Sequence, residues 1–168
     1  MASASGSSLP SPPDSTGNET EANKQDQDQG SAAPRGEAIG GYLENLSEQI
    51  LEVNLNQRDN NHPLVQKHMS PEFRGKHDAL PKVNNRDAHQ DNLKKHLAAQ
   101  PNLKVEILNH SSDVDDSRGR ATVYLYYKLH GLEHGLGREA VAVLSWERKQ
   151  GNWKIIKHQG MRGPSGFS

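Results

Sequence analysis

The chain has 168 residues, a formal net charge of −1 at pH 7 and no cysteine. The lack of cysteine excludes disulfides, thiolate catalysis and cysteine-based zinc or iron sites. The charge balance lacks the clustered basic excess of a nucleic-acid-binding protein. No stretch approaches the roughly 20 apolar residues of a membrane span, and the first residues lack the basic start and apolar run of a secretory signal. We therefore expect a cytoplasmic protein with neither a nucleic-acid nor a membrane partner.

Residues 1–36 are almost entirely small or polar. Leu9 is the only sizeable aliphatic residue after Met1, and the segment has no aromatic residue. Such a segment cannot bury enough apolar surface to offset an ordering entropy of roughly 1–2 kcal/mol per residue. The sequence thus predicts a disordered N-terminal tail over residues 1–36, a folded domain over 37–163 and a short C-terminal tail over 164–168. A solvated tail is favoured over an arm that folds on a partner.

Helical periodicity opens the predicted domain. After Gly40 and Gly41, which we expect to close the tail, apolar residues recur at three- and four-residue steps from Leu43 to Val53. A short second helix is expected to start at Pro63, since proline suits the first helical turn.

A third helix is predicted over residues 86–100, after a short strand over residues 73–77. Its apolar stripe is thin, because Leu93 and Leu97 are joined at helical spacing only by His89 and His96. The two histidines are seven residues apart, about 10 Å along a helix axis, which is too far for them to share one metal ion.

The rest of the chain has the character of β-structure. Strands are expected over residues 103–107, 120–130, 138–148 and 153–161, where β-branched and aromatic residues are enriched or alternate with polar ones. The segment SSDVDDSRG (residues 111–119) is expected to be a polar turn region. Three helices followed by hairpin-connected strands predict an α+β domain, with the helices on one face of a curved antiparallel sheet.

The closing pair of strands, VLSWERKQGNWKIIKHQGMRG, resembles the end of SnoaL-like domains in the nuclear-transport-factor-2-like superfamily. The pattern is a tryptophan-bearing strand, a glycine turn, then tryptophan, aliphatic residues, histidine and a final glycine. The association domain of calcium/calmodulin-dependent kinases ends similarly. The resemblance implies a cone-shaped curved sheet packed against three N-terminal helices, a pocket between them, and commonly a homodimer through the sheet.

The resemblance also implies a kind of chemistry. Ketosteroid isomerase, scytalone dehydratase, limonene epoxide hydrolase and polyketide cyclases share this fold and use a mostly apolar cavity with a few carboxylates, histidines or tyrosines. Such surroundings shift pKa values until a side chain works as an acid or base near neutral pH. We therefore expect a pocket protein for a small apolar or polyketide-like molecule, such as a cofactor-free isomerase, cyclase, dehydratase or hydrolase, with no metal site. A non-catalytic dimerisation or protein-interaction module is the alternative.

The last strand supplies the first catalytic candidate. Strict alternation places Ile156, His158 and Gly160 on one face, and the likeness to the family puts that face toward the cavity. His158 is then the candidate acid or base, although a histidine satisfied by a neighbour would be merely structural. Arg162 has the same parity and is a candidate for binding an anionic group, with a surface role as the alternative.

His77 and Asp78 lie between the short strand and the third helix, where several family enzymes carry a catalytic aspartate or histidine. They are catalytic candidates on that ground. Adjacent residues on an extended strand face opposite sides, so the two are not expected to act together. A loop pair exposed to water is the favoured alternative.

The other candidates are assigned to ligand binding. A helix tyrosine stabilises an oxyanion in the family isomerases, and one of the strand tyrosines should reach the cavity. No clear inward aspartate pair is present, which departs from the isomerase and epoxide-hydrolase patterns. Together with Arg162, the ligand-binding candidates are Tyr42, His96, Tyr124, Tyr126, Leu144, Trp146 and Ile156.

Overall fold

The computed structural model describes residues 35–78, 80–132, 135 and 137–162. In these ranges five strands form one sheet with the order β1-β5-β4-β3-β2. Pairs from β2 to β5 are antiparallel, whereas β1 runs parallel to β5 at the sheet edge. The long strands are thus antiparallel as expected, and the parallel edge strand β1 makes the sheet mixed. The strands are β1 (Met69–Lys76), β2 (Lys104–Asp115), β3 (Arg120–His130), β4 (Arg138–Lys149) and β5 (Asn152–Arg162).

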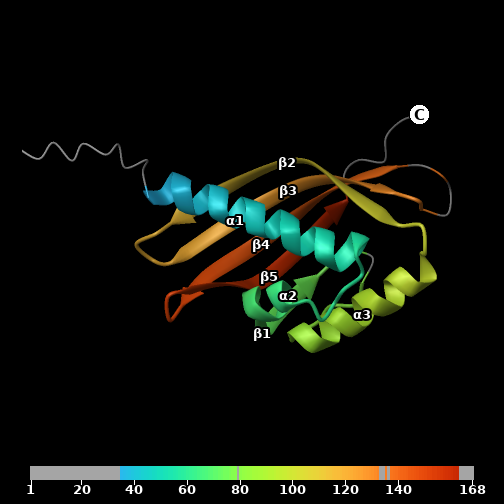
Figure 1. Ribbon diagram of the computed structural model, residues 1–168, viewed down its shortest axis with the longest axis horizontal. Coiled ribbons are helices and arrows are strands. Elements are labelled where there is room, and N and C mark those ends of the chain that lie inside the picture. Colours follow the sequence, from blue (N-terminus) through green and yellow to red (C-terminus); the bar gives the residue numbers. More distant parts are fainter. Residues whose placement is uncertain (1–34, 79, 133–134, 136, 163–168) are drawn as a thin grey trace, which may run out of the picture. The chain divides into compact units, whose positions relative to one another are not determined.

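Three α-helices pack on the curved sheet, which is not closed, so the predicted α+β class is confirmed (Figure 1). They are α1 (Arg35–Leu51), which continues into a π-helical turn η1 (Glu52–Asn56), α2 (Pro63–His68) and α3 (Arg86–Ala99). Helix α1 lies along β2 and β3, while α3 packs on β1. None of these helices is both long and apolar enough to cross a membrane.

Local sequence signals explain where α2 and α3 begin. The His62 ring accepts a hydrogen bond from the backbone N–H of Leu64, and Pro63 follows in the first turn, where its missing N–H costs nothing. The Asn85 side chain accepts from the backbone N–H of Ala88 at 2.7 Å, an N-cap that satisfies one free helix donor. Both predicted starts are confirmed.

Helix α1 starts earlier than the glycine pair suggested. Gly40 and Gly41 lie inside it, and so do Arg35 and Gly36 from the predicted tail. A Cβ on Gly40 would lie 2.6 Å from the Ser112 hydroxyl oxygen, so this glycine allows α1 to approach β2 closely. A glycine in the middle of a helix destabilises it by about 0.5–1 kcal/mol relative to alanine. Here the close packing of α1 on β2 offsets that loss. The rest of the predicted N-terminal tail, and residues 163–168, lie outside the described residues.

Two strands are longer than predicted. Strand β2 continues through most of the expected turn region, since residues 111–115 pair in register with β3. Its second half is polar because β2 is an edge strand with little buried surface there. Strand β1 starts at Met69 and includes Pro71, which an edge strand tolerates because one side of its backbone needs no partner.

A densely packed region lies where α1 crosses the middle of the sheet. Trp146 is the largest side chain of this region, and its indole N–H donates a hydrogen bond to the Ser47 hydroxyl at 3.2 Å. The polar group of this buried ring is therefore satisfied. We call this region the packed end; its side chains are almost completely buried and comprise Leu43, Val123, Leu125 and Trp146.

Candidate functional site

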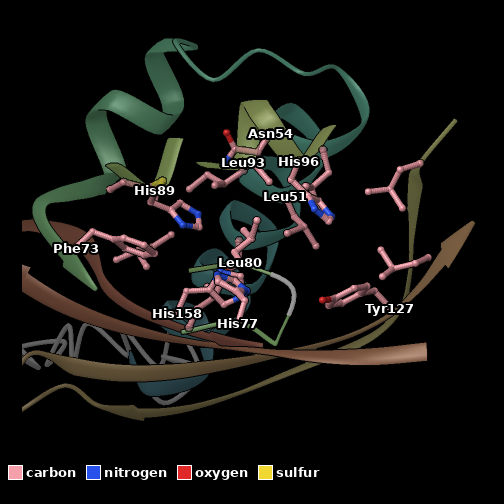
Figure 2. A pocket seen from close by; sticks show the side chains of 18 residues that line it. Leu51, Asn54, Phe73, His77, Leu80, His89, Leu93, His96, Tyr127 and His158 are labelled. Atoms are coloured by element: carbon pink, nitrogen blue, oxygen red, sulfur yellow. The ribbon is translucent and has the colours of Figure 1, made fainter. Parts of the chain in front are cut away.

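A cavity of about 130 Å³ lies between the sheet, the end of α1 and helix α3 (Figure 2). Most of its wall is aliphatic or aromatic, and no carboxylate, lysine or arginine is among its lining residues in the described part of the chain. Its polar groups come from four histidines and three neutral side chains: His77, His89, His96, His158, Ser47, Asn54 and Tyr127.

Strand pairing brings His77 and His158 together. Strand β1 runs parallel to β5 with Gly75 opposite His158, and His77 follows directly after β1 ends. A Cβ on Gly160 would lie 2.8 Å from the Nδ1 atom of His77, so glycine leaves the space that this ring occupies. The edge strand and the last strand therefore deliver two histidines to one place.

A bulge in β5 decides which residues of that strand face the cavity. The register with β4 shifts so that Trp146 pairs with Ile155 and Ser145 pairs with Lys157, which leaves Ile156 as the extra residue. Ile155 and His158 both line the cavity as a result, while Ile156 lies on the opposite face. The strict alternation that placed Ile156 beside His158 is wrong here.

Helix α3 adds the third ring of a close group, which we call the histidine cluster (His77, His89 and His158). The centroids of His77 and His158 are 4.1 Å apart in an edge-on arrangement, and those of His77 and His89 are 5.3 Å apart and stacked. Ring nitrogens, one from each of the three residues, lie within 4.8 Å of one another. Figure 2 shows the three rings converging from separate elements on one end of the cavity.

Burial keeps the histidine cluster uncharged at neutral pH. It lowers the pKa of His77 to about 4, although the nearby Asp78 carboxylate opposes the shift. Burial, together with repulsion from protonated His77, lowers the pKa of His89 to about 3. The pKa of His158 also falls well below its ordinary value, mainly through burial and then through its two histidine neighbours.

Two nitrogens of the histidine cluster have no internal partner. The Nε2 atoms of His77 and His158 are buried and make no hydrogen bond with any described residue. An unsatisfied buried polar group costs about 1–3 kcal/mol, so such groups are uncommon outside functional sites. His68 is also buried, but its Nδ1 lies 3.0 Å from the Trp153 carbonyl oxygen. The buried rings of His77 and His158 therefore each carry an unpartnered nitrogen, unlike the Nδ1 atom of His68.

The cavity continues into a second hollow of about 230 Å³ toward the surface. His77, His96 and Tyr127 line both spaces. Asp78 and Arg162 line only the outer hollow, where the Arg162 guanidinium lies 3.5 Å from the Asp78 carboxylate. The two residues therefore stand at the mouth of the site and are paired with each other.

The predicted site residues divide into those that the fold brings to the cavity and those that it does not. His77, His96, Leu144 and His158 line it. Trp146 belongs to the packed end. The three tyrosines predicted as ligand-binding residues do not line the cavity and are substantially exposed, at 52 % for Tyr42, 42 % for Tyr124 and 37 % for Tyr126.

The tyrosine placement has a simple physical reason. Ala121, Val123 and Leu125 fix the buried face of β3, so Tyr124 and Tyr126 must point to the other side. Tyr127 shares the buried parity and lines the cavity. Burial raises the pKa of its hydroxyl, which keeps it protonated as a hydrogen-bond donor.

His89 and Asn54 also line the cavity, although neither was among the predicted ligand-binding or catalytic groups. His89 lies on the apolar stripe of α3, and that unusual position was the available signal. Asn54 lies in the η1 turn, and its side-chain oxygen is buried without a partner among the described residues. No sequence periodicity indicates a π-helical turn, so this residue could not have been placed in advance.

Solved structures share this architecture at low sequence identity. An uncharacterised protein with a cystatin-like fold from Caulobacter vibrioides matches with a TM-score of 0.65 and 12 % identity, over 77 % of this chain and 92 % of that one. An NTF2-like protein of unknown function from Pseudomonas putida matches with a TM-score of 0.63 and 12 % identity, over 74 % and 86 %. The hexachlorocyclohexane dehydrochlorinase LinA-type3 from Novosphingobium barchaimii matches with a TM-score of 0.62 and 12 % identity, again over 74 % and 86 %.

These matches establish the fold as nuclear-transport-factor-2-like, as the closing strands predicted. No protein-family model matches the chain, and no curated protein matches it.

Proposed function

We propose that the domain binds a small, uncharged, largely apolar molecule in its cavity and acts on it at the histidine cluster. The observation that carries the proposal is the pair of buried Nε2 atoms, on His77 and His158, that no described residue satisfies. A polar group of a bound molecule would satisfy them, while the aliphatic wall would hold the rest of that molecule.

The cavity volume limits the size of that molecule. A cavity of about 130 Å³ is close to the roughly 150 Å³ apolar cavity that accommodates benzene in an engineered protein. One ring fits, whereas a steroid or a multi-ring polyketide would need the outer hollow as well. Of the polyketide-like and other apolar compounds expected from the sequence, the compact ones are favoured.

The low pKa values of the histidine cluster limit its use as a general base. A general base works best when its pKa is near the working pH, and the pKa values of about 4 and about 3 for His77 and His89 are far below it. A role for His158 as acid or base remains a prediction. One solved structure with this fold is a dehydrochlorinase, which supports the proposal that the domain is an enzyme.

Single-ring compounds offer the direct test. We expect phenol, cyclohexanone or a similar probe to raise the unfolding temperature, because a ligand at 100 times its Kd adds about 2.7 kcal/mol of stability. Leu93→Phe should abolish the effect by filling the cavity that Leu93 lines. Leu108→Phe is the matched control, since Leu108 is 42 % exposed on β2 and does not line the cavity. A blank screen, or binding unaffected by Leu93→Phe, would reject the proposal.

A homodimer through the sheet is a second proposal, and it suits either an enzyme or an interaction module. Tyr126, Val141 and Met161 lie side by side across β3, β4 and β5. Tyr126 and Met161 are exposed, at 37 % and 54 %. Exposed apolar side chains on neighbouring strands are candidates for an association surface. Sedimentation should show a dimer that Met161→Lys dissociates, and a wild-type monomer at micromolar concentration would reject it.

A further inference from the structure

We propose that the histidine cluster is a three-histidine site for a divalent transition-metal ion, with Zn²⁺ the first candidate, and that one coordination position faces the cavity. The inference deepens the proposed function and rests on it, since the open position is useful only if a small molecule enters the same cavity. The starting observation is geometric: one ring nitrogen from each of the three histidines, which come from the segment after β1, from α3 and from β5, lies within 4.8 Å of the others.

The distances are compatible with coordination after a small closure. A tetrahedral zinc ion with Zn–N bonds of about 2.0–2.1 Å holds its ligand nitrogens about 3.4 Å apart. His77 lies just beyond the end of an edge strand, and His89 lies in a helix that packs on that strand. Coordination therefore requires the nitrogens, which lie within 4.8 Å of one another, to move closer, and the stacked rings of His77 and His89 to turn so that both face one ion.

The backbone around the cluster keeps room for the rings. A Cβ on Gly160 would lie 2.8 Å from the Nδ1 atom of His77, and one on Gly75 would lie 3.2 Å from the Nδ1 atom of His89. Both glycines are in strands, where glycine weakens the sheet and often marks a close approach. Here they leave space beside two of the three proposed ligands.

The cluster differs from the other histidines that the structure describes. Each of those has a hydrogen-bonding partner in the protein, whereas the Nε2 atoms of His77 and His158 are buried without one. The partnered histidines are His62, His68, His96, His110 and His130, next to Leu64, Trp153, Gln100, Glu44 and Glu106 respectively.

The donor set selects the metal. Three neutral imidazoles without a carboxylate suit zinc and its first-row neighbours, while Mg²⁺ and Ca²⁺ prefer oxygen ligands. Neutral rings are also ready to bind at pH 7 without first losing a proton. Three protein ligands plus one open position is the arrangement of catalytic rather than structural zinc sites. Such an ion would polarise a carbonyl oxygen, or lower the pKa of a bound water, inside an apolar cavity.

The test uses the full chain, stripped of metal with a chelator and then titrated with Zn²⁺ alone. We expect one ion per chain by calorimetry, and visible absorption bands of tetrahedral cobalt when Co²⁺ replaces Zn²⁺. His77→Gln, His89→Gln and His158→Gln should each weaken binding at least tenfold. His96→Gln is the matched control, because His96 lines the same cavity but is not part of the cluster. Near-ultraviolet circular dichroism checks that each variant is folded.

The outcomes separate this inference from the proposed function. An absence of stoichiometric binding, or equal weakening by His96→Gln, would overturn the metal site. If the metal-free protein still binds a single-ring probe and loses it in Leu93→Phe, the small-molecule cavity stands without the metal. If Zn²⁺ binds through the cluster while every ring probe fails, the metal site stands and the proposed ligand class is wrong.

Discussion

The packed end and the histidine cluster lie under the same layer of helices but differ in whether their buried polar groups have hydrogen-bond partners. The Trp146 indole is 1 % exposed and donates to Ser47, so its polar group is satisfied within the protein. The cluster buries the Nε2 atoms of His77 and His158 beside open space, with no described partner. The first arrangement stabilises the fold, whereas the second costs stability unless a bound group satisfies the two nitrogens.

The strongest test of that contrast is to remove the largest side chain of the packed end. Trp146→Ala should lower the free energy of unfolding by about 3–5 kcal/mol, because it deletes a fully buried ring and leaves a cavity. Urea denaturation followed by far-ultraviolet circular dichroism measures the loss. A change below about 1 kcal/mol would mean that this region is not the stable part of the domain.

Acid should destabilise the protein through the histidine cluster rather than through the packed end. The folded-state pKa values of His77 and His89, about 4 and about 3, lie below the unfolded value near 6.5. The unfolded chain therefore takes up protons first, so stability is complete above pH 6.5 and falls as the pH drops toward the folded values. Lowering the pH from 6.5 to 5 should therefore reduce the free energy of unfolding by about 2 kcal/mol for each of these two rings, because they stay neutral in the folded protein.

Urea titrations at several pH values, with a chelator present to keep the protein metal-free, measure this slope. His77→Gln should remove the share that His77 contributes and leave the remainder. A free energy of unfolding that is flat between pH 7 and pH 5 would show that the cluster is open to water, and the contrast with the packed end would fail.

The same contrast explains what could be predicted from the sequence. Helix caps, strand composition and the closing hairpin are local signals, and they gave the right class and fold. Within the packed end, alternation along Ala121, Val123 and Leu125 is regular, so the buried face of β3 could have been identified from its apolar residues alone.

The cavity end depends on departures from regular patterns. One bulge at Ile156 reverses the parity of β5, and the parallel pairing of β1 with β5 places His77 beside His158 from 81 positions away in the chain. Neither feature has a periodic signal in the sequence. His77, His96 and His158 were recognised as candidates through residue type and family likeness, but their geometric relation, and the inclusion of His89, needed the tertiary structure.

The smallest expected changes in the free energy of unfolding come from enlarging one side chain at the packed end and one side chain beside the cavity. Val123 is completely buried at the packed end, so Val123→Phe should cost about 1–3 kcal/mol by overpacking. Leu93 is also buried, at 6 % exposure, but it borders the cavity, and the added ring of Leu93→Phe can enter that space. We expect a change of less than about 1 kcal/mol for Leu93→Phe, because filling a cavity offsets part of the strain. Equal losses from the two substitutions in urea denaturation would show that the cavity cannot accept a ring, and a single-ring ligand would then be excluded on steric grounds.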